Sequence, residues 1–207
     1  MAKPLDVLVI ESLPGAAAWA AHVLESAGHR VHRCYADRPG FPCVGVTSPD
    51  LCPIARHVDV ALLVRPRVAP RATALEQGAA CVIRAGVPLV EQGSAALDPY
   101  EPFLAARVDQ DPVATCEAAN DAALDELRRE ILRLAGPILF TVGILAGQTV
   151  CRIEPQATRL HVTFDLPVRV THAVKQALAV RVLDAVRRQE RTYGPVQVSV
   201  HDRHGEA

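Results

Sequence analysis

The chain has no excess of either charge, because 22 lysines and arginines face 23 aspartates and glutamates and leave a formal net charge of -1. Nucleic-acid-binding proteins need a broad basic surface, so we expect no nucleic acid among its partners. Long apolar runs are missing as well. The longest uncharged one, residues 138–145, is far shorter than the ~20 residues of a membrane helix, so we expect no membrane span.

Familiar catalytic and nucleotide-binding motifs are also missing from these 207 residues. The sequence has no Gly-x-Gly-x-x-Gly and no P-loop, and its eight histidines are scattered rather than set in a Ser/His/Asp or Cys/His motif. The first ten residues have the pattern of a strand and not of a signal peptide. We therefore expect a cytoplasmic protein, in which six cysteines are thiols or metal ligands rather than disulfides.

Strands and helices alternate along the first part of the chain. The predicted strands cover residues 5–10, 30–35, 58–64, 87–90 and 104–108, and the predicted helices cover 14–27, 73–85 and 115–135. This alternation favours an α/β domain with a parallel sheet and helices on both faces. Gly136-Pro137 should break the last helix, so we place a domain boundary there, between residues 1–136 and 137–207.

Residues 6–11 (Asp-Val-Leu-Val-Ile-Glu) and 59–64 (Asp-Val-Ala-Leu-Leu-Val), with the helix between them, resemble a response-regulator receiver domain. The resemblance implies a flavodoxin-like sheet. Receivers have two carboxylates after the first strand, a phosphoacceptor aspartate ending the third and a lysine after the fifth. Here Glu11 is followed by a serine, Val64 stands at the acceptor position and Asp109 follows the fifth strand. The resemblance therefore implies the fold without phosphotransfer.

The second part of the chain predicts a small α+β domain. A hairpin (149–153 and 160–166), a long amphipathic helix (171–189) and an alternating strand (196–201) follow one another. This pattern resembles the small domain of the alkaline shock protein family, which implies a module for assembly or partner binding. The helix has a wide apolar face, formed by Val174, Leu178, Val182, Leu183 and Val186. We therefore expect a homodimer or a protein partner through this domain.

Four cysteines form a candidate metal site. Cys34, Cys43 and Cys52 recur at equal spacing around a Pro/Gly-rich loop (36–57), and Cys81 follows. Thiolates gathered by such a loop could hold zinc or an iron–sulfur cluster. His32, two residues before Cys34, is an alternative ligand to Cys81. The other interpretation is that these are separate thiols, and that Cys81 in particular is a small apolar residue of a helix.

A second candidate site lies where the strands end. Glu11 follows the first strand, and Arg65, Arg67 and Arg71 follow the third, at the edge where open α/β sheets bind ligands. Arginines there could grip a phosphate or a carboxylate. Two functions therefore stay open. One is a non-enzymatic regulatory or sensory protein with a cysteine-bound metal, and the other is a flavodoxin-like enzyme or binding protein for a small anion.

Overall fold

The computed structural model describes residues 3–34, 45, 48–66, 68–156, 159–189 and 195–202. The chain forms two compact units, residues 1–122 and 123–207. Each unit has hydrophobic clusters of its own. Among the described residues, no helix is long and apolar enough to cross a membrane.

Unit 1 is built on a parallel sheet of five strands in the order β2-β1-β3-β5-β7. The strands are β1 (Asp6–Glu11), β2 (Arg30–Arg33), β3 (Val60–Val64), β5 (Leu89–Gln92) and β7 (Leu104–Arg107). The central strands β1 and β3 are almost wholly buried, as continuous apolar runs predict. The polar strand β2 lies at one edge of the sheet, where a strand with few apolar residues is expected.

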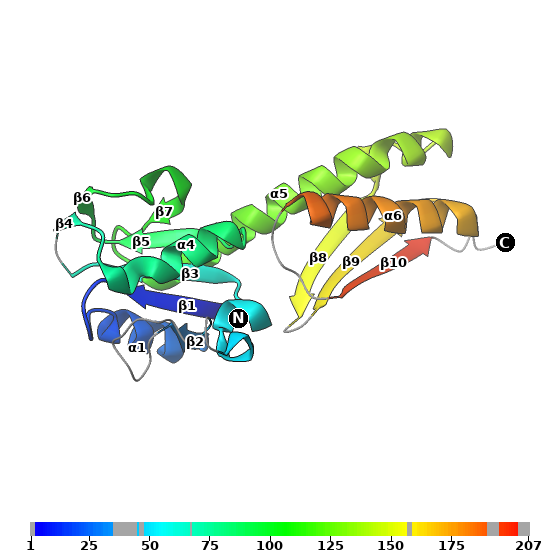
Figure 1. Cartoon of the computed structure of the whole chain (residues 1–207). Helices are drawn as coiled ribbons and strands as arrows, with labels where there is room; N and C mark the ends of the chain where they lie inside the picture. The colour runs from blue at the N-terminus through cyan, green and yellow to red at the C-terminus, as the bar shows by residue number, and fades with distance from the viewer. Residues whose placement is uncertain are drawn as a thin grey trace. The chain divides into compact units, whose positions relative to one another are not determined.

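Helices cover both faces of this sheet (Figure 1). On one face Val7, Val9 and Leu62 pack against α1 (Ala18–Ser26) and the first turns of α5 (Pro112–Thr141). On the other face Leu8 and Leu63 pack against α4 (Gln77–Arg84), with α3 (Pro53–Arg56) beside them. The alternation of side chains along each strand explains why one apolar run feeds two cores.

Trp19 of α1 is exposed, although it is a large and mostly apolar side chain. The buried residues of α1 are Ala20, Ala21 and Leu24. Two alanines let the helix backbone approach the strands closely, and the indole of Trp19 points away from that contact.

Short elements follow the ends of β3 and β5. β4 (Ala69–Arg71) and β6 (Ala95–Leu97) form a separate two-stranded parallel ribbon. The 3₁₀ turn η2 (Ala74–Glu76) leads directly into α4, and the predicted capping box between Thr73 and Glu76 is present. Other single 3₁₀ turns are η1 (Pro49–Leu51), η3 (Glu101–Phe103) and η4 (Ala146–Gln148). Of the loop predicted over 36–57, the described part thus includes η1 and α3.

The long helix α5 does not end where the sequence predicts. It begins with Asp111, whose carboxylate accepts a hydrogen bond of 2.8 Å from the Val113 backbone, and it continues through Pro137 to Thr141. The predicted break at Gly136-Pro137 is therefore wrong. Ala135 and Leu139, on either side of Pro137, are both fully buried in the core of unit 2, and this packing outweighs the helix-breaking effect of proline. The division between the compact units falls inside α5, between residues 122 and 123.

Unit 2 is a three-stranded sheet with helices on one face. Its elements are β8 (Val150–Gln156), β9 (Arg159–Leu166), α6 (His172–Arg188) and β10 (Val196–Asp202), in the sheet order β10-β9-β8. β8 and β9 form the predicted hairpin, and β10 pairs parallel to β9 because α6 connects them. Within α6, Leu178, Val182 and Val186 are buried in this unit's own core. Most of the helix face that the sequence predicts for a partner is therefore buried inside unit 2. A homodimer or a partner contact through this domain stays a prediction.

Candidate functional site

A pocket of roughly 550 Å³ opens at the carboxyl ends of β1 and β3. Ser12 and Leu13 follow β1, and Pro66 follows β3. The other lining residues lie in β4 or between it and η2, or begin η2: Pro70, Arg71, Ala72, Thr73 and Ala74. From β1 the chain runs outward to β2 on one side, and β3 begins the other half of the sheet. Ligands of doubly wound sheets bind at this reversal of strand order. The position and the volume of the pocket both suit a small molecule.

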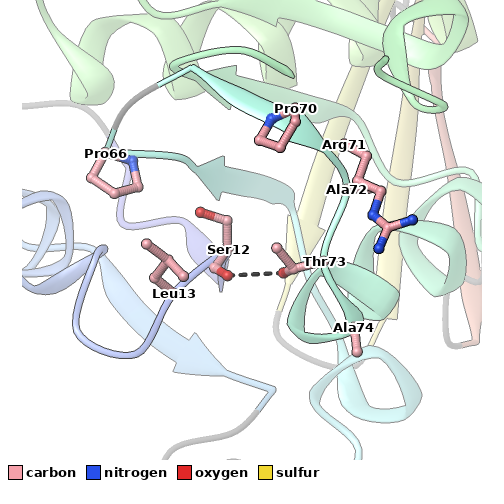
Figure 2. Close-up of a pocket in the computed structure, with 8 residues that line it drawn as sticks. All are labelled: Ser12, Leu13, Pro66, Pro70, Arg71, Ala72, Thr73 and Ala74. Carbon is pink, nitrogen blue, oxygen red and sulfur yellow. Dashed lines mark hydrogen bonds between the residues drawn. The ribbon is translucent and has the colours of Figure 1, made fainter. Parts of the chain in front are cut away.

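The residues that line the pocket come from two sides (Figure 2). Leu13 and Pro66 lie on one side of the view, and Arg71 lies on the other. The Thr73 hydroxyl donates a 2.8 Å hydrogen bond to the Ser12 carbonyl and ties the two walls together. In the described part of the chain, the side chain of Arg71 has no ion pair or hydrogen bond. Its guanidinium is therefore the cation available to a ligand in this pocket.

The sequence predicts Arg65 at an anion-binding site, but its side chain belongs to an internal network. Its side chain is fully buried, and its nitrogens donate hydrogen bonds to Glu76, Glu91 and Asp98. A guanidinium has five N–H donors, and these five hydrogen bonds use all of them. We therefore assign Arg65 to an internal network rather than to contact with an external ligand.

The network around Arg65 contains more carboxylates than arginines. The carboxylates of Glu76, Glu91 and Asp98 surround Arg65, and Arg107 contributes a second cation 3.1 Å from Glu91. Burial raises the pKa of Glu91 to about 7, and the neighbouring Asp98 adds to the rise. For Asp98, burial alone would raise the pKa, but hydrogen bonds with Arg65 and Glu91 outweigh it and lower it. One proton on Glu91 thus balances the charge of two arginines and three carboxylates.

Two other residues predicted for anion binding have separate outcomes. Glu11 ends β1 and accepts a hydrogen bond of 3.3 Å from the backbone of Ala17, just before α1. This contact gives Glu11 a role in holding the start of the helix. Arg67 lies outside the described residues. Of the described residues predicted at this edge, Arg71 lines the pocket, whereas Glu11 and Arg65 do not.

The candidate cysteine ligands occupy different elements. Cys34 follows β2 and packs against the core on the α4 face, Cys52 precedes α3, and Cys81 lies in α4, where its sulfur accepts a hydrogen bond of 3.6 Å from Arg84. Cys43 lies outside the described residues. Cys34, Cys52 and Cys81 do not form a three-ligand cluster within the described set. A zinc or iron–sulfur site that includes Cys43 stays a prediction.

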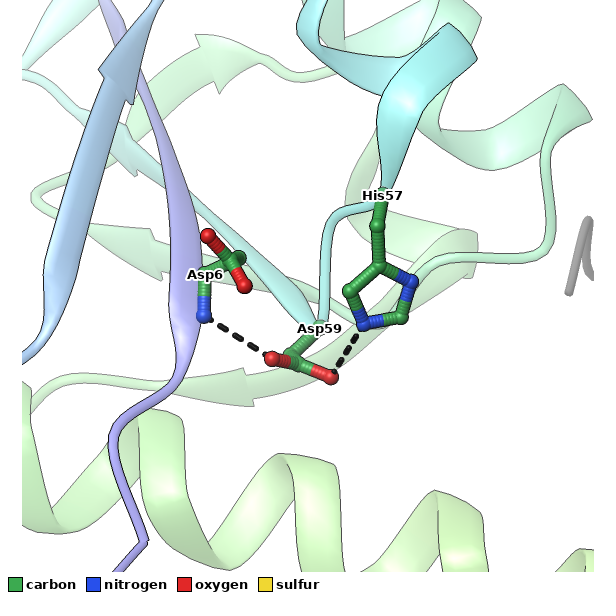
Figure 3. Close-up of side chains that lie close together, drawn as sticks. All are labelled: Asp6, His57 and Asp59. Atoms are coloured by element: carbon green, nitrogen blue, oxygen red, sulfur yellow. Dashed lines mark hydrogen bonds and ion pairs between the residues drawn. The ribbon is translucent and has the colours of Figure 1, made fainter. Parts of the chain in front are cut away.

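A different group of metal-ligand residues lies at the opposite edge of the sheet (Figure 3). Ligand atoms of Asp6, His57 and Asp59 lie within 4.8 Å of one another, and this is the only such group among the residues that the structure describes. No motif in the sequence indicates this group, because the histidines are scattered along the chain. The spacing His57-x-Asp59, directly before a buried strand, was the available signal.

Comparisons with known proteins do not indicate a family or a function for this chain. The chain matches no protein-family model, and no curated protein matches it.

Proposed function

We propose that unit 1 is a receiver-like domain of a non-enzymatic regulatory protein, and that it binds a small organic anion in the pocket beside Arg71. The single observation that carries the proposal is a pocket at the ends of β1 and β3 with a cation on its rim. In the sheet order β2-β1-β3-β5-β7, the second strand lies outside the first and the remaining strands follow in chain order. Flavodoxin-like sheets have the same order, which supports the proposal. Such sheets bind their ligands at this point.

The chemistry of the lining indicates the class of ligand. Leu13, two prolines and two alanines form an apolar surface, and the polar groups are Arg71 and two hydroxyl residues. A guanidinium pairs with a carboxylate or a phosphate through parallel hydrogen bonds. The expected ligand is therefore a small molecule with one anionic group and a short apolar body.

The residues at the position that corresponds to a receiver's phosphoacceptor support a binding role over phosphotransfer. Where the receiver resemblance requires an aspartate, this chain has Val64 followed by Arg65. The guanidinium of Arg65 occupies the end of β3 with its three carboxylate partners. A receiver responds to phosphate bound there, whereas this domain would respond to a ligand held a few residues further along the same loop.

The test is a screen of small carboxylates and organic phosphates for a rise in the melting temperature of the full chain, followed by calorimetric titration. Arg71→Gln should weaken the binding of a positive compound about tenfold to a hundredfold, the value of a charge-assisted hydrogen bond. Arg169→Gln, at an exposed arginine of unit 2, is the matched control and should bind as the wild type does. Equal affinity of Arg71→Gln and wild type would contradict the proposal, as would a screen with no positive compound.

A further inference from the structure

Three polar side chains meet at the amino ends of β1 and β3, on the edge opposite the pocket. Asp6 opens β1, and His57 and Asp59 directly precede β3 (Figure 3). Asp6 and Asp59 are buried, and the side chain of His57 is only 11% exposed. Each residue offers one ligand atom, and the three atoms lie within 4.8 Å of one another.

Hydrogen bonds already orient these ligands. One oxygen of Asp59 accepts a 2.8 Å bond from the Asp6 backbone, and the other lies 2.8 Å from Nε2 of His57. The Asp59 carboxylate is thereby fixed between β1 and the imidazole. Held side chains of this kind are what a metal site requires, because ligands that must be ordered on binding reduce affinity.

A second histidine approaches the group from the neighbouring strand. Nε2 of His32 in β2 lies 2.8 Å from an oxygen of Asp6, and its side chain is 36% exposed. From this position His32 can orient Asp6 or supply a fourth ligand, although it is not one of the three residues whose ligand atoms lie within 4.8 Å of one another. Arg30 also pairs with Asp6, but its side chain is 56% exposed and can move away into water.

We propose that Asp6, His57 and Asp59 form a zinc-binding site, with His32 as the fourth ligand or as the partner that orients Asp6. Two carboxylates and one or two imidazoles are a donor set that zinc and its neighbours in the first transition series accept. A tetrahedral zinc ion ~2.1 Å from each ligand holds these atoms about 3.4 Å apart. The three ligand atoms lie within 4.8 Å of one another in the structure, so small side-chain rotations would bring them to this spacing.

A bound dication would replace the cation that now pairs with Asp6. Arg30 donates two hydrogen bonds to the Asp6 carboxylate, and a zinc ion would bind with this exposed side chain displaced. The site is chemically distinct from the predicted cysteine site, because all of its donors are nitrogen and oxygen. It is also independent of the anion pocket, since it lies at the other ends of the same strands.

The test uses Co²⁺ added to the metal-free full-length protein, because its visible spectrum reports the ligands. We expect one Co²⁺ to bind with visible bands of nitrogen and oxygen ligation and without a thiolate charge-transfer band. Zn²⁺ should then displace it and raise the melting temperature. His57→Ala should abolish these bands, and His32→Ala should weaken binding roughly tenfold or more. His22→Ala, at an exposed histidine of α1, is the control and should leave the spectrum unchanged.

Three results would overturn the proposal. The first is a wild-type protein that binds no Co²⁺ at millimolar concentration, and the second is a His57→Ala spectrum identical to that of the wild type. The third is a spectrum dominated by thiolate charge transfer that Cys52→Ser removes and His57→Ala does not. Circular dichroism of His57→Ala shows whether the variant is folded, and if it is not, His57→Gln replaces it.

Discussion

At the scale of single residues, the network around Arg65 has the strongest effect on the protein. Three carboxylates and two arginines share a small, mostly buried volume at the ends of β3 and β5. Removal of one partner from a buried ion pair leaves an uncompensated charge and typically costs ~3–5 kcal/mol. The network therefore stabilises the fold only as a complete set, and the protonation of Glu91 is part of that set.

Glu91 makes stability depend on pH. Its pKa is about 7 in the folded chain and near the ordinary 4.5 when unfolded. Both states hold this proton below pH 4.5, but between about 4.5 and 7 only the folded chain keeps it. The free energy of unfolding should therefore fall as pH rises through that window, by at most ~3 kcal/mol from this group.

The variant Glu91→Gln should reduce this slope, because glutamine keeps the shape of the protonated acid and cannot titrate. Urea unfolding of wild type and variant at a series of pH values from 4.5 to 8 measures it. Glu101→Gln is the control, since Glu101 pairs with the same Arg107 at 3.2 Å but is exposed. Parallel pH profiles for wild type and Glu91→Gln would show that the carboxyl does not titrate in this range.

At the scale of elements, α5 contains a short sequence that disfavours helix formation. Gly136 and Pro137 are adjacent inside it, although both residues disfavour a helix interior. Apart from its two chain neighbours and the backbone of its own helix, a Cβ added at Gly136 would meet no atom within 4 Å. Gly136→Ala should therefore raise the free energy of unfolding by about 0.5–1 kcal/mol, because alanine loses less backbone entropy on folding.

Gly143 provides a matched comparison just after the same helix. A Cβ there also meets open space, but its φ of +76° lies in the left-handed region. Gly143→Ala should destabilise the protein by roughly 1 kcal/mol, because an L-residue is strained in that conformation. Urea unfolding measures both variants. The same sign of effect for both alanines would contradict the explanation from backbone conformation.

At the scale of the whole molecule, each compact unit has its own hydrophobic cores. Phe164 is fully buried in the core of unit 2, and Leu62 is fully buried in that of unit 1. Separate cores predict separate losses of stability. Phe164→Ala should destabilise unit 2 by about 3–5 kcal/mol, and Leu62→Ala should destabilise unit 1 by about 2–5 kcal/mol.

Hydrogen exchange read out by mass spectrometry distinguishes the two responses. Phe164→Ala should raise exchange in β8, β9 and α6, and it should leave β1 and β3 protected. Leu62→Ala should have the opposite effect. If either variant raised exchange equally in both units, the chain would unfold as a single cooperative body.

Much of the fold could be predicted from the sequence, because it depends on local patterns. The apolar runs of β1 and β3 indicated buried parallel strands, and the Thr73–Glu76 capping box marked the start of a helix. The strand predicted over residues 104–108 corresponds to β7, Leu104–Arg107. These signals arise from side-chain periodicity and backbone hydrogen bonding between near neighbours, which need no knowledge of distant residues.

Only the tertiary structure decided which charged residues meet. Arg65 follows a strand like any surface arginine, and its burial depends on Glu76, Glu91 and Asp98 arriving from three later segments. Asp6 and Asp59 come together for the same reason, since β1 and β3 are neighbours in the sheet although far apart in the chain. The energy of a buried charge depends on all partners within a few ångströms, and the sequence around one residue does not contain them.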